Sequence, residues 1–235
     1  RSGGFMSTDI LSLKMGVTSS YLLRGTSGIV MIDTGMPDKM KLFVKKIRSL
    51  HILPHDIKLV ILTHSHIDHA GSAKEIQELT GAQVMIHKSE KECLEKCEFY
   101  PVNGTGTWGR ISKQIFFPFL KRIKYSAPRI DIETGDEDFP LSGFGIDGYV
   151  MHTPGHTPGS VSVILNTGEA FVGCMSHSGF PFRTTPGLPL YASDIEKLKL
   201  SWKKLFEKGV KIIFPGHGKP FPAGIIRKRL ASPEV

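Results

Sequence analysis

Three histidines and one aspartate stand within seven residues of this chain, in the stretch THSHIDH from Thr63 to His69. Imidazole and carboxylate groups are common ligands of zinc. His64 and His66 alternate along an extended chain, so both side chains project to one side and can hold one ion. Asp68 shares their register, and His69 is offset toward a second position. A chain with ten histidines also forms such clusters by chance, most often in surface loops.

The residues around this cluster predict a strand before it and a helix after it. The unbroken apolar run at 59–62 is typical of a strand in a sheet that helices cover on both faces. The stretch AGSAKEIQELTG predicts a helix that begins near Ala70 and is closed by Gly81. Loops after strand ends often carry the chemistry of α/β proteins. The cluster therefore lies where a functional site is expected.

Two distant histidines are candidates to complete a metal site, since one short cluster cannot fill two coordination spheres. His156 lies in HTPGHTPGS at a predicted strand end, where prolines and glycines form a tight loop. His217 lies in FPGHG, directly after the apolar stretch VKIIF. Each follows an apolar strand, as His64 does. We expect His51, His55, His87 and His152 to be surface or packing residues.

The order of predicted elements indicates two packed sheets. A hairpin turns at 25–28, and the helix after Pro37 carries Met40, Val44, Ile47 and Leu50 on one stripe. A strand at 82–87 and a helix bearing Cys93 and Cys97 on one face follow the histidine cluster. The second half contains several strands, a helix at 194–208 and a last strand at 210–214. Strands flanked by helices at both ends favour two sheets with helices outside.

The stretch between Tyr100 and Pro128 differs in composition and predicts a cap-like excursion, around residues 100–130, in which Pro118 interrupts any helix. Its aromatic and basic side chains suit contact with an anionic or apolar substrate, a dimer interface or a membrane surface. These side chains are Tyr100, Trp108, Phe116, Phe117, Phe119, Tyr125, Arg110, Lys113, Lys121, Arg122 and Lys124.

Composition narrows the classes of function. The formal net charge is +8, but most basic residues lie on the polar faces of predicted helices, so no nucleic-acid partner is expected. No apolar run is long enough to span a membrane. Three cysteines form no disulfide framework, and we expect a cytoplasmic protein that acts on a small molecule, with a homodimer as an open possibility.

The motifs HSHIDH, TPGHTPGS and FPGHG, with MIDTG upstream, resemble those of the metallo-β-lactamase superfamily, and the similarity runs from about Ser20 to His217. The resemblance implies an α/β (α+β) fold, a four-layer αβ/βα sandwich of two mixed β-sheets with helices on the outer faces. Residues 1–235 would form a single domain of this kind, from which the cap-like excursion projects. It also implies a binuclear metal site along one edge of the paired sheets.

The resemblance assigns the metal ligands residue by residue. His64, His66 and His156 would hold the first ion. Asp68, His69 and His217 would hold the second. Asp33 of MIDTG matches the buried aspartate that supports the ligand loop in this family.

Cys174, in FVGCM, departs from the family pattern, because members with this motif usually place an aspartate there to bridge both ions. A cysteine in this setting is often a small buried core residue. Beside six candidate ligands, however, a thiolate is a strong zinc ligand. We therefore expect Cys174 to be a ligand and the ions to be zinc, with a single ion, iron or manganese as alternatives.

The resemblance implies hydrolysis by a metal-bound hydroxide, because two ions lower the pKa of a shared water from 15.7 to about 7. Asp68 would orient this hydroxide and carry its proton. His177, three residues beyond Cys174, is a candidate donor to the developing oxyanion. We expect an ester, lactone or thioester substrate. The alternatives are β-lactam hydrolysis, a weakly active or non-catalytic metal-binding member and, with less support, a ribonuclease.

Overall fold

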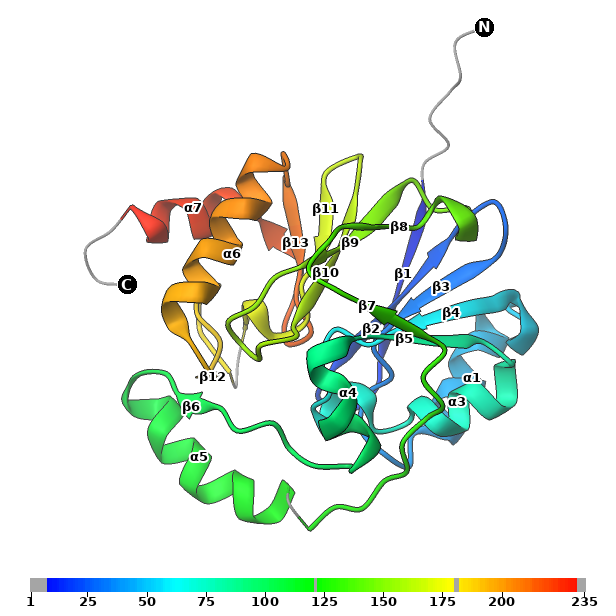
Figure 1. Cartoon of the computed structure of the whole chain (residues 1–235), viewed down its shortest axis with the longest axis horizontal. Coiled ribbons are helices and arrows are strands. Elements are labelled where there is room, and N and C mark those ends of the chain that lie inside the picture. Colours follow the sequence, from blue (N-terminus) through cyan, green and yellow to red (C-terminus); the bar gives the residue numbers. More distant parts are fainter. Residues whose placement is uncertain (1–7, 121, 180–181, 232–235) are drawn as a thin grey trace, which may run out of the picture.

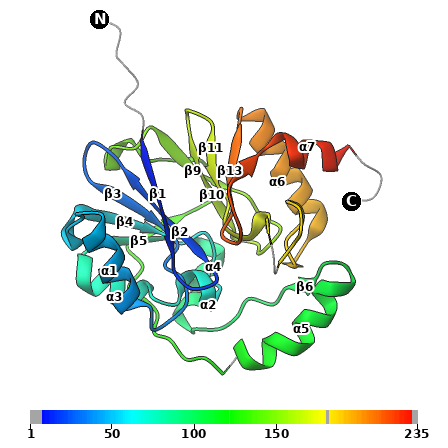
Figure 2. The same cartoon turned by 180° about the vertical axis from the view of Figure 1, so that it is seen from behind.

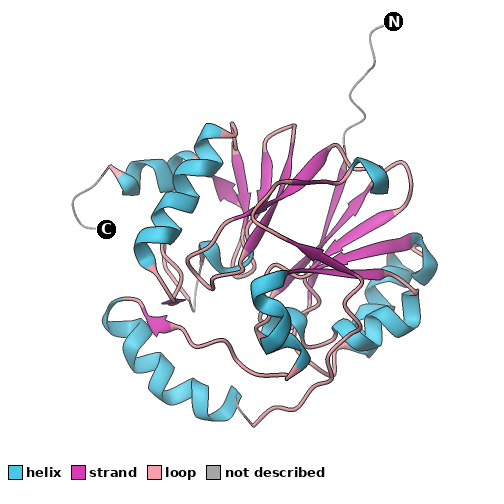
Figure 3. Cartoon of the chain, viewed as in Figure 1, coloured by secondary structure: helices cyan, strands magenta, loops and turns pink. Residues whose placement is uncertain are grey.

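Two six-stranded β-sheets pack face to face, and helices cover their outer faces (Figure 1). The computed structural model describes residues 8–231, apart from 121 and 180–181. The four layers are distinct when the ribbon is coloured by secondary structure (Figure 3). The expected four-layer sandwich of two mixed sheets is therefore confirmed.

The first sheet holds the strand that leads to the histidine cluster. In spatial order its strands are β1 (Asp9–Lys14), β2 (Ser19–Arg24), β3 (Ile29–Ile32), β4 (Ile57–Ile61), β5 (Gln83–His87) and β7 (Ile132–Thr134). The first three pair antiparallel, which confirms the predicted hairpin between β2 and β3. The pairs from β3 to β7 are parallel, so their carboxyl ends share one edge of the sheet.

The second sheet contains the strands that lead to the distant candidate ligands. In spatial order it consists of β14 (Phe221–Pro222), β13 (Ile212–Phe214), β11 (Glu169–Phe171), β10 (Val161–Leu165), β9 (Gly148–His152) and β8 (Phe139–Pro140). All neighbours pair antiparallel except β11 and β13, which are parallel. Both sheets are therefore mixed.

In the described part of the chain, five helices cover the sheets. Three apolar clusters hold the layers together: one beneath the helices of the first sheet, one between the sheets and one beneath the helices of the second sheet. In β4, Leu59 and Ile61 face the second sheet while Val60 faces the helices, which explains the unbroken apolar run. The helices are α1 (Met40–Ser49), α3 (Ala73–Thr80) and α4 (Lys88–Glu95) on the first sheet, and α6 (Ile195–Glu207) and α7 (Gly224–Leu230) on the second.

The chain after β4 corrects one prediction about the histidine cluster. A short helix, α2 (Ile67–Ala70), includes Asp68 and His69, so these two residues do not continue the extended register of His64 and His66. The helix predicted to begin near Ala70 is divided into α2 and α3. Between them Gly71 packs so closely that a Cβ there would lie 2.4 Å from the Pro37 ring.

Two further predictions about helices are wrong. Cys97 lies beyond the end of α4 with a φ of +53°, so it does not share a helix face with Cys93. Pro118 does not interrupt the helix in the excursion, because α5 (Gly106–Leu120) contains it. The proline stands in the last turn of α5, where its missing N–H removes one backbone hydrogen bond.

Helix α5 lies outside both helical layers. Figures 1 and 2 show α5 from opposite sides. It lies beyond one end of the sandwich, the end at which α2 and β12 (Tyr191–Ala192) are found. Strand β6 (Asn103–Gly104) belongs to the excursion and pairs antiparallel with β12. This pairing joins the excursion to the segment that precedes α6. Lys121, one of its predicted basic side chains, lies outside the described residues. Among the residues that the structure describes, no helix has the length and hydropathy needed to cross a bilayer.

Gly155 tests how the loop of His156 is positioned. Its φ is +138°, and an added Cβ would lie 2.4 Å from the backbone of Leu198 in α6. We therefore expect Gly155→Ala to lower the free energy of unfolding by about 1–3 kcal/mol, measured by urea denaturation. Gly143→Ala is the control, because nothing lies within 4 Å of its added Cβ. Equal stability of the two variants would contradict this close packing.

Candidate metal centre

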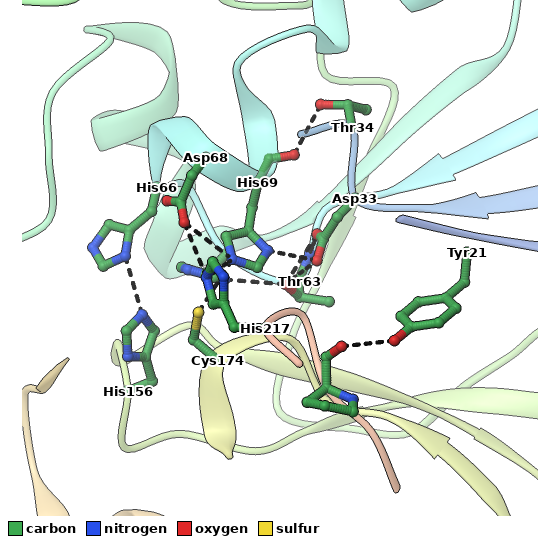
Figure 4. A network of polar contacts seen from close by, with 12 residues as sticks. Tyr21, Asp33, Thr34, Thr63, His66, Asp68, His69, His156, Cys174 and His217 are labelled. Atoms are coloured by element: carbon green, nitrogen blue, oxygen red, sulfur yellow. Dashed lines mark hydrogen bonds and ion pairs between the residues drawn. The ribbon is translucent and has the colours of Figure 1, made fainter. Parts of the chain in front are cut away.

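Six predicted ligands converge in two groups at one edge of the sheets, and Figure 4 labels all of them except His64. In each group, one potential ligand atom per residue lies within 4.8 Å of the others. The residues come from segments up to about 150 positions apart in the chain, as the ring contact between His69 and His217 shows. The first group is His64, His66 and His156, and the second is Asp68, His69 and His217.

Strand ends position these side chains. The loop after β4 carries His64 and His66, and α2 then places Asp68 and His69. The remaining ligands follow β9 and β13 of the second sheet. Tyr21 of β2 donates a hydrogen bond from its hydroxyl to the Pro215 carbonyl at 2.7 Å, which joins the loop of His217 to the first sheet (Figure 4).

In the first group, the hydrogen bonds define which ring nitrogen is free. A carbonyl oxygen can only accept, so His66 donates from Nε2 to the Tyr100 carbonyl (3.1 Å) and His156 donates from Nδ1 to the Tyr191 carbonyl (2.8 Å). The other nitrogens, His66 Nδ1 and His156 Nε2, then face each other at 3.0 Å. Two lone pairs are thus directed into the same space.

His64 follows the same rule through a hydroxyl group. Thr63 Oγ1 has one proton and donates it to the Asp33 carboxylate at 2.9–3.0 Å. It must therefore accept from Nδ1 of His64, 3.0 Å away. The opposite nitrogen, Nε2, is buried and has no hydrogen-bond partner among the described residues. An unpartnered buried lone pair is costly unless a ligand occupies its site.

The second group repeats this arrangement. His69 donates from Nδ1 to Asp33 Oδ2 at 2.7 Å, and His217 donates from Nδ1 to the Val17 carbonyl at 3.1 Å. Their Nε2 atoms lie 3.3 Å apart, and Asp68 Oδ2 is 3.0 Å from Nε2 of His217. All five histidines thus donate outward and turn their other ring nitrogen toward the centre. In His217 that nitrogen, Nε2, donates to Asp68, so an ion would have to displace its proton.

The donor set fits zinc. Ligands about 2.0–2.1 Å from a tetrahedral ion lie roughly 3.3 Å from each other. The nitrogen pairs of the two groups are separated by 3.0 and 3.3 Å. Burial and the neighbouring His156 lower the pKa of His66 to about 3, which leaves it neutral. Burial also lowers the pKa of His217, but Cys174 and Asp68 raise it to about 9, so this group favours a positive charge.

Cys174 lies between the two groups. Its Sγ is 3.1 Å from Nε2 of His69, and it forms compact sets with His64 and His69 and with His177 and His217. Burial raises the pKa of the thiol, but the charges of His69 and His217 outweigh this effect and hold its pKa well below the ordinary value. Its potential partners therefore include His64 of the first group and His69 and His217 of the second.

His177 differs from the five other histidines in its hydrogen bonds. It is buried, its ring centroid is 4.8 Å from that of His217, and its Nδ1 accepts from the backbone N–H of Leu190 at 3.4 Å. An accepting Nδ1 places the proton of the neutral ring on Nε2. Nε2 has no hydrogen-bond partner in the part of the chain that the structure describes. This tautomer suits a hydrogen-bond donor better than a metal ligand.

The four histidines expected to be surface or packing residues lie outside the two groups. His51 and His55 are exposed. His87 and His152 stack with ring centroids 4.2 Å apart and planes at 11°, and both lie near Asp136. With the exposed Asp136 they form a further set whose potential ligand atoms lie within 4.8 Å of one another, apart from the two groups of the candidate centre.

Asp33 and Glu90 are buried carboxylates that hold the ligand loops. Asp33, the predicted supporting aspartate, accepts from the backbone and hydroxyl of Thr63 and from His69. Glu90 of α4 was not predicted. Its Oε2 accepts from Ser65 N at 3.0 Å and Ser65 Oγ at 2.6 Å, and its Oε1 accepts from Gly159 N at 3.0 Å. It therefore joins the loop of the histidine cluster to the loop of His156.

A cavity of about 710 Å³ lies between the start of α5 and the segment after residue 181. Phe182, in its wall, lies against the rings of His217 and His177, with centroids 4.4 and 5.3 Å away. The cavity thus adjoins the candidate metal centre. Its lining includes Trp108, Phe182, Arg183, Leu188 and Leu190.

Comparisons with known proteins identify the family of this chain. The sequence model of the metallo-beta-lactamase superfamily matches residues 13–217. "Probable metallo-hydrolase YflN" of Bacillus subtilis (strain 168) is 31% identical over 181 residues, which cover 73% of this chain and 66% of that protein. About a third of that relative therefore lies outside the alignment. The family match spans all seven predicted ligand positions.

Two solved structures show the same fold. A metallo-beta-lactamase family protein from Thermus thermophilus has a TM-score of 0.68 at 19% identity, and the match covers 95% of this chain and 76% of that one. An archaeal metallo-beta-lactamase superfamily protein from Sulfolobus tokodaii has a TM-score of 0.66 at 20% identity and covers 97% and 88% of the two chains. At this identity the likeness concerns the fold alone.

Glu90 provides a test of how the ligand loops are held. Both carboxylate oxygens of Glu90 accept hydrogen bonds, but in Glu90→Gln one of them becomes an NH₂ group, which cannot accept. One buried donor then loses its partner, so we expect the free energy of unfolding to fall by about 1–3 kcal/mol. We also expect zinc affinity, measured by competition with a chelator, to fall about 10–100-fold. The control is Glu92→Gln on the same helix, where an exposed pair with Lys96 is lost at a cost of about 0–1 kcal/mol. Matching results for the two variants would contradict this function of Glu90.

Proposed function

Because this chain belongs to the metallo-β-lactamase superfamily, we propose that it is a metal-dependent hydrolase that cleaves an ester, lactone or thioester bond of a small molecule. The observation that carries the proposal is the convergence of five histidine nitrogens, a carboxylate and a thiol in one buried centre. The name of the Bacillus subtilis relative, a probable metallo-hydrolase, supports the same class of reaction.

The residues of the two groups would hold two zinc ions. His64, His66 and His156 would bind the first, Asp68, His69 and His217 the second, and Cys174 would contact both. Such ions supply Lewis acidity, which activates a water for attack and polarises the scissile carbonyl group.

Asp68 is the residue that we propose to orient the attacking water and to carry its proton. Burial raises the pKa of its carboxyl group, but His69 and His217 outweigh this and hold it below the ordinary value. Its side chain remains 21% exposed, whereas the histidines beside it are almost fully buried. A charged carboxylate at the accessible side of the centre can accept a proton and return it to the leaving group.

His177 is the residue that we propose to donate to the oxyanion. Burial lowers the pKa of its ring to about 4, so it is neutral at pH 7, and the Leu190 N–H leaves its proton on Nε2. A neutral donor in a buried pocket stabilises developing negative charge, because it is already in place and no water has to be rearranged around it. Its Nε2, unpartnered among the residues described, is available for this contact.

The adjoining cavity supports a substrate with an apolar portion. Trp108, Phe182 and Leu188 supply apolar surface, and Arg183 is the basic side chain in the lining. A substrate with an acyl chain or an aromatic ring and an anionic group would match these contacts. The pocket therefore favours a carboxylic ester, lactone or thioester over a purely polar substrate.

The metal content tests the proposal most directly. Protein purified without added metal should contain about two zinc ions per chain by elemental analysis, and a chelator should remove them together with hydrolysis of lactone, ester or thioester substrates. Added zinc should restore both, because the ligands remain in place. Protein that binds zinc but hydrolyses none of these, nor a β-lactam, would be a non-catalytic member and would contradict the proposal.

Cys174→Ser tests the thiolate ligand. Loss of a residue that only supports a metal ligand weakens metal binding by roughly 10–100-fold. We expect loss of the ligand itself in Cys174→Ser to weaken zinc binding at least as much. In cobalt-substituted protein we expect a sulfur-to-metal charge-transfer band that Cys174→Ser abolishes. Cys93→Ser is the control, because Cys93 lies on α4 outside the cluster. An unchanged band in Cys174→Ser, or a gain of metal and activity in Cys174→Asp, would show that the natural thiol is no working ligand.

His177→Gln tests the proposed donor. We expect kcat to fall by about 10²–10³-fold while the zinc content stays at the level of the natural protein, because an oxyanion donor acts in the transition state. His152→Gln is the control, since it removes a largely buried histidine outside the centre. Loss of zinc in His177→Gln would instead identify this residue as a ligand.

A further inference from the structure

We propose that α5 docks the protein on an anionic lipid bilayer. A stripe of apolar side chains on this helix would enter the headgroup region, and the basic side chains of the excursion would contact lipid phosphates. The stripe consists of Trp108, Ile111, Ile115 and Phe119. This inference concerns a surface outside the metal centre and holds whether or not the protein is a hydrolase.

The apolar stripe is exposed over its whole length. The four side chains are 52%, 45%, 49% and 62% exposed, and their spacing of three and four residues places them along one side of the helix. Of the eleven large apolar residues exposed in the described part of the chain, six lie between Trp108 and Ile123. Single exposed apolar residues are ordinary, but a contiguous row of them marks a binding surface.

Other positions of α5 attach it to the protein. A Cβ on Gly109 would lie 2.4 Å from the Leu190 carbonyl oxygen, and Tyr191 donates a hydrogen bond to Ser112 at 2.9 Å. Phe117 packs on Tyr191 and on Phe99. A helix on the surface of a protein normally directs its polar side outward. Here the attached positions are buried, and the exposed part of the helix carries the apolar stripe beside Arg110 and Gln114.

The charges around the stripe indicate what covers it. Residues 101–130 include six lysines and arginines and no aspartate or glutamate, so they provide most of the formal net charge of +8. Arg110 and Lys113 are on α5 itself, and Arg122 and Lys124 follow it. Apolar side chains combined with clustered bases are typical of helices that lie in the interface of an anionic membrane.

A second copy of the chain fits this surface less well than lipid does. In a twofold dimer the same patch faces itself, so two segments rich in bases and free of acids would meet. Like charges brought together oppose association, and the cores of protein interfaces are depleted in lysine. A surface of lipid phosphates supplies the missing negative charge.

The fold places α5 outside the sandwich. Figures 1 and 2 agree that α5 lies outside the two helical layers, at the end of the molecule where the loops after the strands meet. Trp108 belongs both to the stripe and to the wall of the 710 Å³ cavity. Docking through α5 would therefore hold the mouth of this cavity near the lipid surface.

Vesicle flotation with the whole chain tests the proposal. We expect the protein to float with vesicles that contain phosphatidylserine, to bind at least about ten times more weakly to pure phosphatidylcholine vesicles, and to dissociate as salt is raised. Tryptophan emission should shift to shorter wavelength on binding. The shift reports on Trp108, because Trp202, the other tryptophan, is fully buried.

Two variants isolate the contributions of the stripe and of the charges. Ile115→Glu should reduce vesicle binding at least about tenfold, whereas Leu200→Glu, at an exposed apolar position on α6, should not. Arg110→Gln combined with Lys113→Gln leaves the stripe intact and should weaken binding to anionic vesicles only. Circular dichroism would check the fold of each variant.

Three results would overturn the proposal. The first is absence of binding to anionic vesicles. The second is equal binding to neutral and anionic vesicles, since the charges would then contribute nothing. The third is a dimer in analytical ultracentrifugation that Ile115→Glu dissociates, because a second copy would then be the occupant of the stripe.

Discussion

The candidate centre depends on one constraint: five buried histidine rings must each direct a ring nitrogen at the same small volume. Nitrogens 3.0–3.3 Å apart repel one another unless a proton or a cation lies between them, so each ring has to be held by a hydrogen bond on its far side. The acceptors are Thr63 Oγ1, the Asp33 carboxylate and the carbonyl groups of Val17, Tyr100 and Tyr191. They come from loops of the first sheet, from the excursion and from β12, and the fold brings these elements to one edge of the sandwich.

Much of this arrangement could be predicted from the sequence, because the strands and ligands have local signals. The apolar run before His64 identified β4, and the glycine- and proline-rich loops identified His156 and His217. The acceptors had no such signal, since every residue has a backbone carbonyl group. Glu90 was missed because KSEKEC has the composition of a solvated helix, although Glu90 is fully buried. The helical position of Asp68 and His69 depends on packing of Gly71 against Pro37, which no local pattern indicates.

Cys174 changes the electrostatics of the centre in a way that an aspartate would not. The sulfur of a thiolate accepts hydrogen bonds more weakly than a carboxylate does, so hydrogen bonds stabilise its negative charge less. That charge must therefore be compensated by the histidines and by any cation present. Burial raises its pKa, and His69 and His217 reverse that effect. The same thiolate contributes to the raised pKa of His217. The second group therefore carries paired charges that a divalent cation can replace. In the first group, burial lowers the pKa of His64 and His66.

The two groups also differ in what holds them. His66 donates to Tyr100, at the start of the excursion, and stacks on Phe99 at 3.9 Å. His156 donates to Tyr191 of β12, the strand that pairs with β6 beside α5. The acceptors of His69 and His217, in contrast, are Asp33 and Val17, which flank strands of the first sheet. A displacement of α5 would thus reach the first group through two of its three rings, whereas the acceptors of the second group lie on the rigid sandwich. The excursion is accordingly part of the centre's support as well as its cover.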